Sequence, residues 1–297
     1  MPLVYAIILN WNRAKDTICC LNSLATQTYP NLKLVVAENG STDDSISLIS
    51  TAFPDVVLLK NPANLGFAAG MNAGIKFALQ ANADFVFILN NDTVLAPETV
   101  SQLVAYTDQN TGLVAPIIYY DSDPQRIWSL GGRINPWTLE VTHYSRNIID
   151  TGQLPACITQ DFVPGCAMLL SRTALERVGL FDEDFFMYYE DSDLCLRLRA
   201  EGFNILSVAN APMWHKVALS SGGGDSPNER YWMARSSLRF FAKHARWHQA
   251  PFIFIWRLAS ALKTTWRLLH GGKKAALKAY WKGLWHGVQE MKLSGHK

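Results

Sequence analysis

The sequence predicts an α/β protein with a mixed, mainly parallel sheet flanked by helices, followed by a basic, amphipathic helical extension. Three observations support this prediction. Apolar runs of strand length alternate four times with helix-like patterns in the first part of the chain, as in doubly wound domains. These runs are apolar throughout, which is typical of strands buried on both faces. From Pro251 onward, apolar residues recur at helical spacing among many Lys and Arg.

Short apolar runs and helical periodicity place the elements in order along the chain. Strands are expected at residues 3–9, 32–37, 56–59, 84–89, 112–120, 162–170 and 203–208. Helices are expected at residues 14–28, from the glycine-rich stretch 64–74 to residue 79, at 97–109, at 172–178, and from the acidic stretch 181–194 to residue 201. Residues 121–155 are polar and turn-rich, which predicts loop with some hairpin.

Length and composition are those of an ordinary globular protein. The chain has 297 residues, of which 49% are hydrophobic and 18% charged, so one or two domains are expected. We predict an α/β domain over residues 1–248 and a Trp-rich helical extension over residues 249–297. No G-x-G-x-x-G follows the first strand and no G-x-x-x-x-G-K-[ST] occurs, which argues against a nicotinamide dehydrogenase and a P-loop ATPase.

Cysteine usage and charge limit the cellular compartments and partners to be expected. The five cysteines are odd in number and lack metal-ligand spacing, so a reducing, cytoplasmic setting is expected. Met1 leads directly into an apolar run without a basic segment, so no signal peptide is predicted. Residues 240–297 carry eleven Lys or Arg against one acid, Glu290, although the whole chain has a net charge of only +2. This asymmetry indicates an anionic partner, either a membrane or a nucleic acid.

Asn90-Asn91-Asp92 ends the fourth predicted strand, and ligands bind at the carboxyl ends of parallel strands. Asp92 is therefore placed where one hard oxygen ligand meets a metal ion that substrate phosphates also hold. Asn and Asp are also common in turns, so a plain turn is the alternative.

A second acidic cluster, residues 181–194, interleaves acids with five aromatic residues. Capping of the following helix and compensation of its dipole account for Asp191 or Asp193 alone. They do not account for the surrounding rings. Carboxylates packed among rings have raised pKa values, as a general base requires.

Together these stretches resemble the family 2 glycosyltransferases of the GT-A fold, and within them a bacterial rhamnosyltransferase-like branch. The resemblance covers roughly residues 3–241, and seven motifs in the family's order make it specific. The motifs are I-L-N-W-N-R (8–13), E-N-G-S-T-D (38–43), N-L-G-F-A-A-G-M-N-A-G (64–74), L-N-N-D (89–92), P-G-C-A-M-L (164–169), F-F-M-Y-Y-E-D-S-D-L (185–194) and W-H-K (214–216).

The resemblance implies a role for each motif. Asp191 is implied as catalytic base, with Glu190 beside it. Asp92 and His215 are implied as ligands of Mn²⁺ or Mg²⁺, although a lone histidine is more often structural, and Asn90 stands where the metal-binding motif has its first acid. The implied nucleotide-sugar-binding residues are Asn10, Asn12, Glu38, Asn39, Asp43, Asn64, Gly66, Asn72, Asn90, Asn91, Lys216 and Arg235. The implied acceptor-side residues are Gly165, Cys166 and Met168.

The implied activity is metal-assisted, inverting transfer of a sugar from a nucleotide diphosphate sugar to a hydroxyl group in cell-surface polysaccharide synthesis. The resemblance favours dTDP-rhamnose as donor, with UDP- and GDP-sugars as alternatives. The implied acceptor is a glycan or a lipid-linked saccharide. A base of this kind typically accelerates the reaction by about 10²–10⁴-fold.

The C-terminal extension has the features of a membrane-surface segment. Its tryptophans and lysines suit the membrane–water interface, and no run reaches the length of a spanning helix. We therefore expect a cytoplasmic protein, peripheral on the inner face of the cell membrane and without a nucleic-acid partner. The alternative is a helical pair packed on the α/β domain or on a homodimer partner.

Two other functions compete with transfer. A non-catalytic, membrane-associated scaffold would explain the weakened Asn90-Asn91-Asp92 motif, whereas the intact Glu190-Asp191 pair argues against it. A sugar-1-phosphate nucleotidyltransferase would require a Gly- and Arg-rich loop after the first strand, where the chain has Asn10-Trp11-Asn12. Residues 218–228, which include three successive glycines, are a candidate lid.

Overall fold

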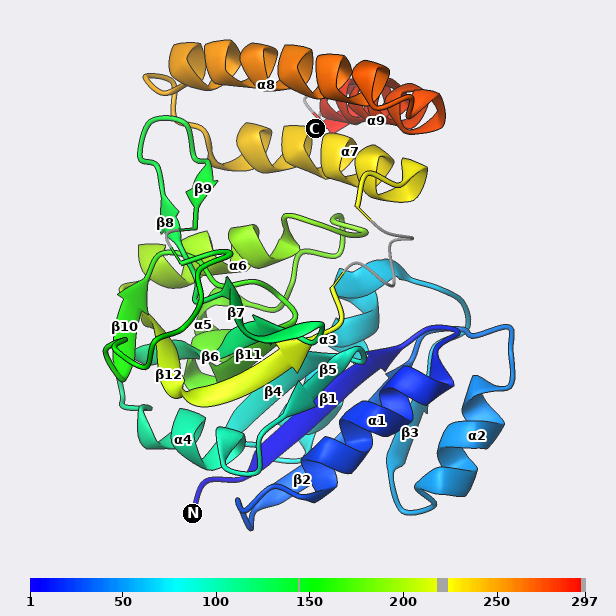
Figure 1. The fold of residues 1–297 in the computed structure, drawn as a ribbon, viewed down its shortest axis with the longest axis vertical. Coiled ribbons are helices and arrows are strands. Elements are labelled where there is room, and N and C mark those ends of the chain that lie inside the picture. Colours follow the sequence, from blue (N-terminus) through cyan, green and yellow to red (C-terminus); the bar gives the residue numbers. More distant parts are fainter. Residues whose placement is uncertain (144, 218–223, 295–297) are drawn as a thin grey trace. The chain divides into compact units, whose positions relative to one another are not determined.

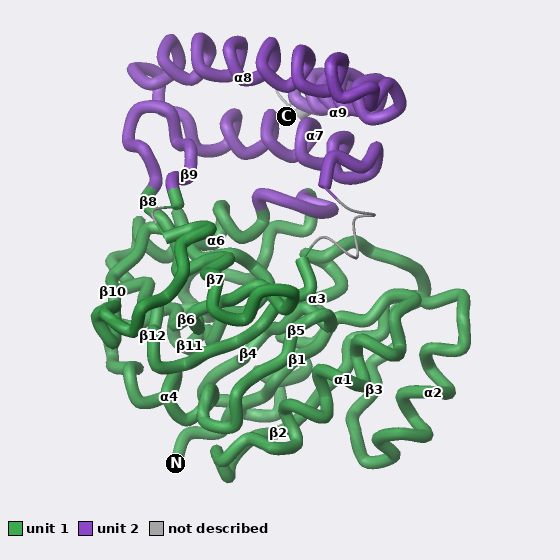
Figure 2. Tube along the Cα trace, viewed as in Figure 1, with its two compact units in different colours: residues 1–133, 143–184, 190–217 green, residues 134–142, 185–189, 218–297 purple. Residues whose placement is uncertain are grey.

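The computed structural model describes residues 1–143, 145–217 and 224–294. The described chain forms two compact units (Figure 2). The first comprises Met1–Arg133, His143–Asp184 and Glu190–Val217, and the second comprises Ile134–Thr142, Phe185–Tyr189 and Ala218–Lys297. Most of the candidate lid, residues 218–223, lies outside the described residues. The domain boundary expected at residue 248 stays a prediction.

The first unit is built on a large mixed sheet (Figure 1). Strands β1, β2, β3 and β4 are parallel, β11 runs antiparallel to β4 and β6, and the order is β10-β12-β6-β11-β4-β1-β2-β3. β5 pairs with β12, and β7 pairs with β6. The strand bounds are β1 Val4–Asn10, β2 Leu32–Glu38, β3 Val57–Lys60, β4 Phe85–Asn90, β5 Thr93–Leu95, β6 Thr111–Tyr120, β7 Asp123–Ser129, β10 Cys157–Gln160, β11 Ala167–Ser171 and β12 Asn204–His215.

Helices connect the parallel strands, which confirms the predicted fold class. α1 follows β1, α2 follows β2 and α3 follows β3, so each parallel connection is a β-α-β crossover. The helix bounds are α1 Ala14–Ala25, α2 Ser45–Ala52, α3 Gly66–Gln80, α4 Thr99–Ala105, α5 Arg172–Val178 and α6 Glu190–Ala200.

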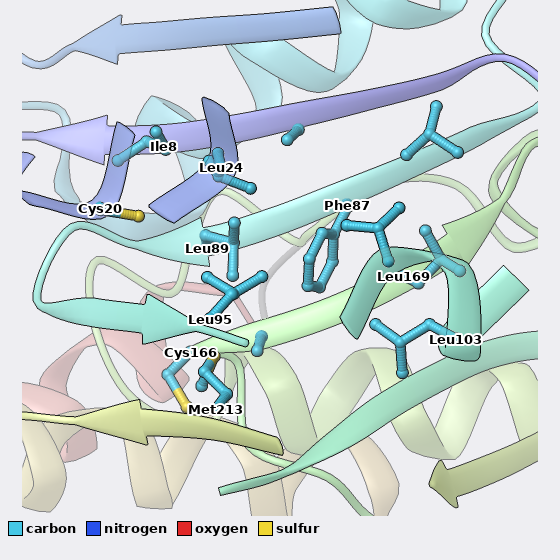
Figure 3. Packing of buried hydrophobic residues seen from close by; sticks show 14 of the residues in the cluster. Ile8, Cys20, Leu24, Phe87, Leu89, Leu95, Leu103, Cys166, Leu169 and Met213 are labelled. Atoms are coloured by element: carbon cyan, nitrogen blue, oxygen red, sulfur yellow. The ribbon is translucent and has the colours of Figure 1, made fainter. Parts of the chain in front are cut away.

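The apolar runs of the sequence form the centre of this unit (Figure 3). Phe87 and Leu89 on β4, Leu169 on β11 and Ile8 on β1 are fully or almost fully buried in one cluster. Because burying an apolar side chain contributes roughly 1.5–3 kcal/mol, this cluster holds the central strands rigidly in place. The polar residues at the ends of those strands therefore have a fixed frame.

Several predicted element bounds were wrong, and the helix predicted at 14–28 ends already at Ala25. The strand predicted at 162–170 begins only at Ala167, because the preceding Gly165 N–H donates to Asp191 rather than to a neighbouring strand. The strand predicted at 203–208 continues to His215 after a register shift between Val208 and Pro212. The helix predicted at 97–109 is shorter, Thr99–Ala105. Strand β5, directly after Asp92, was not predicted, since three residues are too few to show a pattern.

The second unit contains α7 (Pro227–His244), α8 (Ala250–His270) and α9 (Lys274–Ser294), with α8 and α9 separated at Gly271-Gly272. The hairpin of β8 (Arg133–Ile134) and β9 (Val141–Thr142) leads into and out of it. α7 and α9 pack closely at Gly283. A Cβ atom at this position would lie only 2.3 Å from the Tyr231 carbonyl oxygen, so the position requires glycine. In the described part of the chain, none of the helices has the length and apolarity needed to cross a membrane.

Candidate active site

The polar ends of three adjacent parallel strands meet at one edge of the sheet. Asn10 at the end of β1 is in register with Glu38 at the end of β2, and Leu9 is in register with Asn90 at the end of β4. Asn10, Glu38 and Asn39 are almost completely buried. The motif residues that were predicted to bind ligand therefore meet at one edge of the sheet, and ligand binding there stays a prediction.

A chain of side-chain hydrogen bonds crosses this edge. Asn91 Nδ2 donates to Thr17 Oγ1 (3.1 Å), Thr17 donates to Asn10 Oδ1 (2.7 Å), and Asn10 Nδ2 lies 3.2 Å from Ser41 Oγ. Asn10 and Asn91 thus hold the β1, β2 and β4 loops to α1. Their amides are occupied by protein partners, so their first role is to position backbone.

Glu38 and Asn12 shape the turn after β2. The Glu38 carboxylate accepts the N–H groups of Gly40 (3.2 Å) and Ser41 (2.8 Å), and Asn12 Oδ1 accepts the Thr42 N–H (2.7 Å). Asn12 has φ = 53°, a left-handed conformation that Asn adopts more readily than most residues. Asp43, farther along this turn, is exposed, and its carboxylate accepts the Ser45 N–H at 3.0 Å.

The glycine-rich motif forms the turn into α3. Asn39 Nδ2 donates to Asn64 Oδ1 (3.1 Å) and to the Gly66 carbonyl (3.0 Å), and Gly66 has φ = 82°. Asn72, one turn into α3, makes two hydrogen bonds with the backbone of Phe181, at 2.9 and 3.1 Å. Asn72 therefore fixes the start of the second acidic cluster.

Asp92 and His215 form a buried pair, although they are 123 residues apart. The β5–β12 ladder, in which Thr93 faces His215, places His215 Nε2 3.0 Å from Asp92 Oδ1. The Trp128 ring packs edge-on against the imidazole at a centroid distance of 4.9 Å. Although burial raises the pKa of Asp92, the hydrogen bond and charge of His215 outweigh it, so the net shift is downward and the carboxylate is ionised.

A cationic pair lies beside this carboxylate. Lys216 donates its backbone N–H to the Asp92 carbonyl (3.0 Å), and its Nζ donates to Asp16 Oδ1 (3.0 Å). Asp16 also accepts from Arg13 at 3.0 Å, and the charge of Arg13 helps to lower the pKa of Asp92. Asp16 thus gathers two positive side chains near Asp92.

The residues present fit a metal ion that a ligand completes. Asp92 Oδ2 and His215 Nδ1 are buried and have no hydrogen-bond partner among the described residues. Those residues contain no group of three or more His, Cys, Asp and Glu side chains arranged to hold an ion. A carboxylate oxygen is a hard ligand suited to Mn²⁺ or Mg²⁺, and such ions commonly take their remaining oxygens from phosphates. Metal binding at Asp92 and His215 remains a prediction.

The Glu190-Asp191 pair begins α6. Asp191 Oδ2 accepts the Gly165 N–H (3.1 Å), and Oδ1 accepts the Ser192 N–H (2.7 Å). Burial raises the pKa of Asp191, although these hydrogen bonds oppose it. Burial and the neighbouring Asp191 charge raise the pKa of Glu190 well above its usual range. Because Glu190 Oε2 has no partner in the described structure, the pair carries its negative charge on Asp191.

The predicted acceptor-side motif links the two acidic groups. Gly165 bonds Asp191, and the next carbonyl, that of Cys166, accepts the Asn90 N–H at 2.9 Å. The Cys166 pKa is raised well above its usual value, mainly by burial and further by the charges of Asp92 and Asp191. Cys166 therefore lies near both carboxylates. Met168 is fully buried on β11.

Arg235 is the one residue of the predicted site that belongs to the second unit. Its guanidinium bonds both carboxylate oxygens of Glu290 and lies 4.9 Å from the centre of the Trp232 ring. Its role in nucleotide-sugar binding stays a prediction. Thr17, Trp128 and Asp16 were not predicted. Asp16 lies three residues after Arg13, a helical spacing that could have indicated the pairing.

Solved structures establish the fold class. A mannosyltransferase from Pyrobaculum calidifontis, solved in complex with GDP-Man and Mn²⁺, aligns with a TM-score of 0.60 and 19% sequence identity, over 97% of this chain and 75% of that chain. GalNAc-T7, solved with UDP, GalNAc and Mn²⁺, aligns with a TM-score of 0.59 and 14% identity, over 82% of this chain and 50% of that chain. These alignments show that the chain has the GT-A fold.

The family follows from the sequence. Residues 5–179 match the model of glycosyl transferase family 2, which is more than half of the chain, so the protein belongs to that family. An N-acetylglucosaminyl-diphospho-decaprenol L-rhamnosyltransferase of Mycobacterium tuberculosis is 29% identical over 82% of this chain and 86% of its own length. A dTDP-rhamnosyl transferase of Shigella flexneri is 23% identical over 81% of this chain and 80% of its own length.

Proposed function

We propose that the protein transfers rhamnose from dTDP-rhamnose to a hydroxyl group of a lipid-linked saccharide, with inversion at the anomeric carbon, during synthesis of a cell-surface polysaccharide. The similarity to the rhamnosyltransferases of two bacteria, each over most of both chains, supports this donor and acceptor. UDP- and GDP-sugars are the alternative donors.

The observation that carries the proposal is that two carboxylates with oppositely shifted pKa values lie at one sheet edge. Asp92 is kept ionised beside His215, whereas burial makes Asp191 a stronger base than an ordinary aspartate. One side of the edge therefore suits a positively charged ligand, and the other suits removal of a proton. The backbone of residues 165 and 166 holds the two sides together.

Each side then has a separate task. Asp191 takes the proton of the acceptor hydroxyl, whose oxygen attacks the anomeric carbon from the side opposite the nucleotide. The Gly165 and Ser192 N–H groups hold the Asp191 carboxylate in one orientation. Lys216 and Arg13, held by Asp16, draw the diphosphate toward Asp92. A divalent ion held by Asp92 and His215 would neutralise charge on the departing nucleoside diphosphate.

A donor panel tests this function. The melting temperature of the protein is measured with dTDP-rhamnose, UDP-glucose and GDP-mannose, with and without Mn²⁺. A ligand at 100 times its dissociation constant adds roughly 2.7 kcal/mol of stability. We expect the largest shift with dTDP-rhamnose and Mn²⁺, together with release of dTDP when a lipid-linked acceptor is added. Stabilisation by no donor would favour the non-catalytic scaffold, and stabilisation by another donor alone would change the sugar.

A further inference from the structure

Helix α8 has two opposite faces with different environments. On one, Ile253 and Leu268 are buried within the second unit, and Arg257 donates to Ser237 Oγ at 2.8 Å. On the other, apolar side chains that are 52–66% exposed form a stripe along the helix, here called the α8 face: Ile255, Leu258, Leu262, Trp266 and Leu269. The packed face already holds the helix in its unit, and more than half of the surface of each side chain in the stripe is left exposed.

Helix α9 repeats the arrangement with more charge. Ala276 and Tyr280 are buried, and Gly283 lies against α7. Its exposed side, here called the α9 face, carries three lysines and two tryptophans, each kind at four-residue spacing: Lys274, Lys278, Trp281, Lys282 and Trp285. Trp281 is 49% exposed and Trp285 is 63% exposed.

The lysines of this surface are not used by the unit itself. Lys273 and Arg267, which lie near it, form ion pairs with Asp225. By contrast, Lys274, Lys278 and Lys282 on α9 have no ion-pair partner in the part of the chain that the structure describes. Three successive helical turns therefore present positive charge beside exposed indole rings.

We propose that the α8 and α9 faces bind the surface of an anionic lipid bilayer. Amphipathic helices lie in such an interface when aliphatic and Trp side chains cover one face and Lys or Arg flank it. Indole rings sit at the headgroup level, and lysines gain from anionic headgroups near them. Since no described helix can cross a membrane, binding of this kind is along the surface.

A second copy of the chain fits the same faces less well. A symmetric contact through the α9 face would bring its lysines together, and charged residues, Lys above all, are depleted from the cores of protein interfaces. An anionic bilayer instead offers apolar depth to the Leu, Ile and Trp side chains and opposite charge to the lysines. Charge complementarity therefore favours lipid over self-association.

Vesicle sedimentation with the full chain tests the proposal. The protein is mixed with vesicles of phosphatidylglycerol and phosphatidylcholine, or of phosphatidylcholine alone, without donor or acceptor, so the result is independent of transfer activity. We expect binding to the anionic vesicles only, and weaker binding as added salt screens the charges. Equal binding to both vesicles, or none to either, would overturn the proposal.

Matched variants locate the binding surface. Since each Lys near an anionic surface is worth about fivefold in affinity, the double variant Lys278→Gln with Lys282→Gln should lose about tenfold or more. The control, Lys15→Gln with Lys33→Gln, removes the same charge from exposed positions of the first unit. Equal loss in both pairs would mean that net charge alone acts, which contradicts binding by these faces.

A second pair of variants tests the contribution of apolar side chains to vesicle binding. Leu262→Ser on the α8 face should weaken vesicle binding by about tenfold, whereas Leu48→Ser, at a 44% exposed position on α2, should leave it unchanged. Both leucines are exposed, so neither change should unfold the protein, and melting temperatures verify this. Light scattering of the unmodified chain completes the test. A dimer that Leu262→Ser dissociates would assign the α8 face to a second copy and overturn the proposal.

Discussion

Asp92 and Asp191 are both carboxylates enclosed by the protein near the same sheet edge, yet their pKa values move in opposite directions. Burial raises the pKa of both acids. Asp92, however, has His215 at 3.0 Å, and the hydrogen bond and charge of His215 help to bring the net pKa shift of Asp92 below its ordinary value. Asp191 has only neutral N–H and hydroxyl donors, and burial prevails. The partner, not the depth, therefore decides whether a buried acid serves as a stable anion or as a base.

The two acids also differ in how the fold holds them. Asp92 follows a rigid central strand, and its partner arrives on a ladder formed with β12. Asp191 follows two residues with left-handed backbone, Tyr188 (φ = 68°) and Tyr189 (φ = 70°). Non-glycine residues in this conformation cost of order 1–3 kcal/mol each and cluster at functional sites. The comparison indicates a stiff frame around Asp92 and a strained backbone before Asp191.

Removal of the base gives the largest expected effect. Asp191→Asn keeps the shape of the side chain but cannot accept the acceptor proton, so the rate of sugar transfer should fall by about 10²–10⁴-fold. Donor binding should remain, because Asp191 is not required for it. Asp184→Asn, at an exposed position in the same acidic segment, is the control and should transfer at the normal rate. Near-normal transfer by Asp191→Asn would remove the base assignment.

Neutralising Asp92 should weaken metal-dependent donor binding. Asp92→Asn removes the ionised oxygen, so the affinity for donor in the presence of Mn²⁺ should fall by about tenfold or more, the scale seen when outer-shell partners of a metal site are lost. Donor affinity without metal should change less. Calorimetric titration with dTDP, the nucleotide part of the proposed donor, measures the affinity with and without Mn²⁺. If Mn²⁺ strengthens dTDP binding equally in the variant and the unmodified protein, Asp92 is not a metal ligand.

Glu190 sharpens the comparison through the pH dependence of stability. Burial raises its pKa well above the unfolded value, so the folded state retains a proton that the unfolded state loses. The stability it contributes is complete below the ordinary glutamate pKa and is lost as pH rises toward the raised value. Glu190→Gln stays neutral, so the free energy of unfolding of the variant should gain on that of the unmodified protein as pH rises above the ordinary glutamate pKa of about 4.3. A constant difference, from chemical denaturation at each pH, would contradict the raised pKa.

The smallest effect is expected at Asp16, which acts on ligand binding through Lys216 and Arg13. Partly exposed ion pairs contribute about 0–1 kcal/mol, so Asp16→Asn should raise the KM for donor by no more than about fivefold and leave kcat nearly unchanged. Steady-state kinetics with varied donor separates the two constants. A fall in kcat with an unchanged KM would place Asp16 in the chemistry instead.

The sequence was informative where structure is local and uninformative where it depends on long-range pairing. The apolar runs before Asn10, Glu38 and Asn90 predicted their strands, because buried parallel strands need continuous apolar residues. The C-terminal helical extension followed from the helical spacing of its apolar residues.

Pairings between distant residues had no such signal. The β5–β12 ladder joins Thr93 to His215, and neither its three residues nor the register shift before Pro212 appears in a hydrophobic pattern. The resemblance to a family proposed His215 as a ligand, but the contact with Asp92 and the Trp128 ring emerged only in three dimensions. The hydrogen bonds that occupy Asn10, Asn39 and Asn72 were likewise invisible, since one motif can serve either ligand or backbone.

The most direct test compares dTDP binding by Asp92→Asn and Asp191→Asn in one calorimetric series, with and without Mn²⁺. If Asp92 serves the leaving group and Asp191 the nucleophile, Mn²⁺ will strengthen dTDP binding in Asp191→Asn as it does in the unmodified protein, and will fail to do so in Asp92→Asn. Loss of the Mn²⁺ effect in Asp191→Asn, or its survival in Asp92→Asn, would contradict this division of tasks.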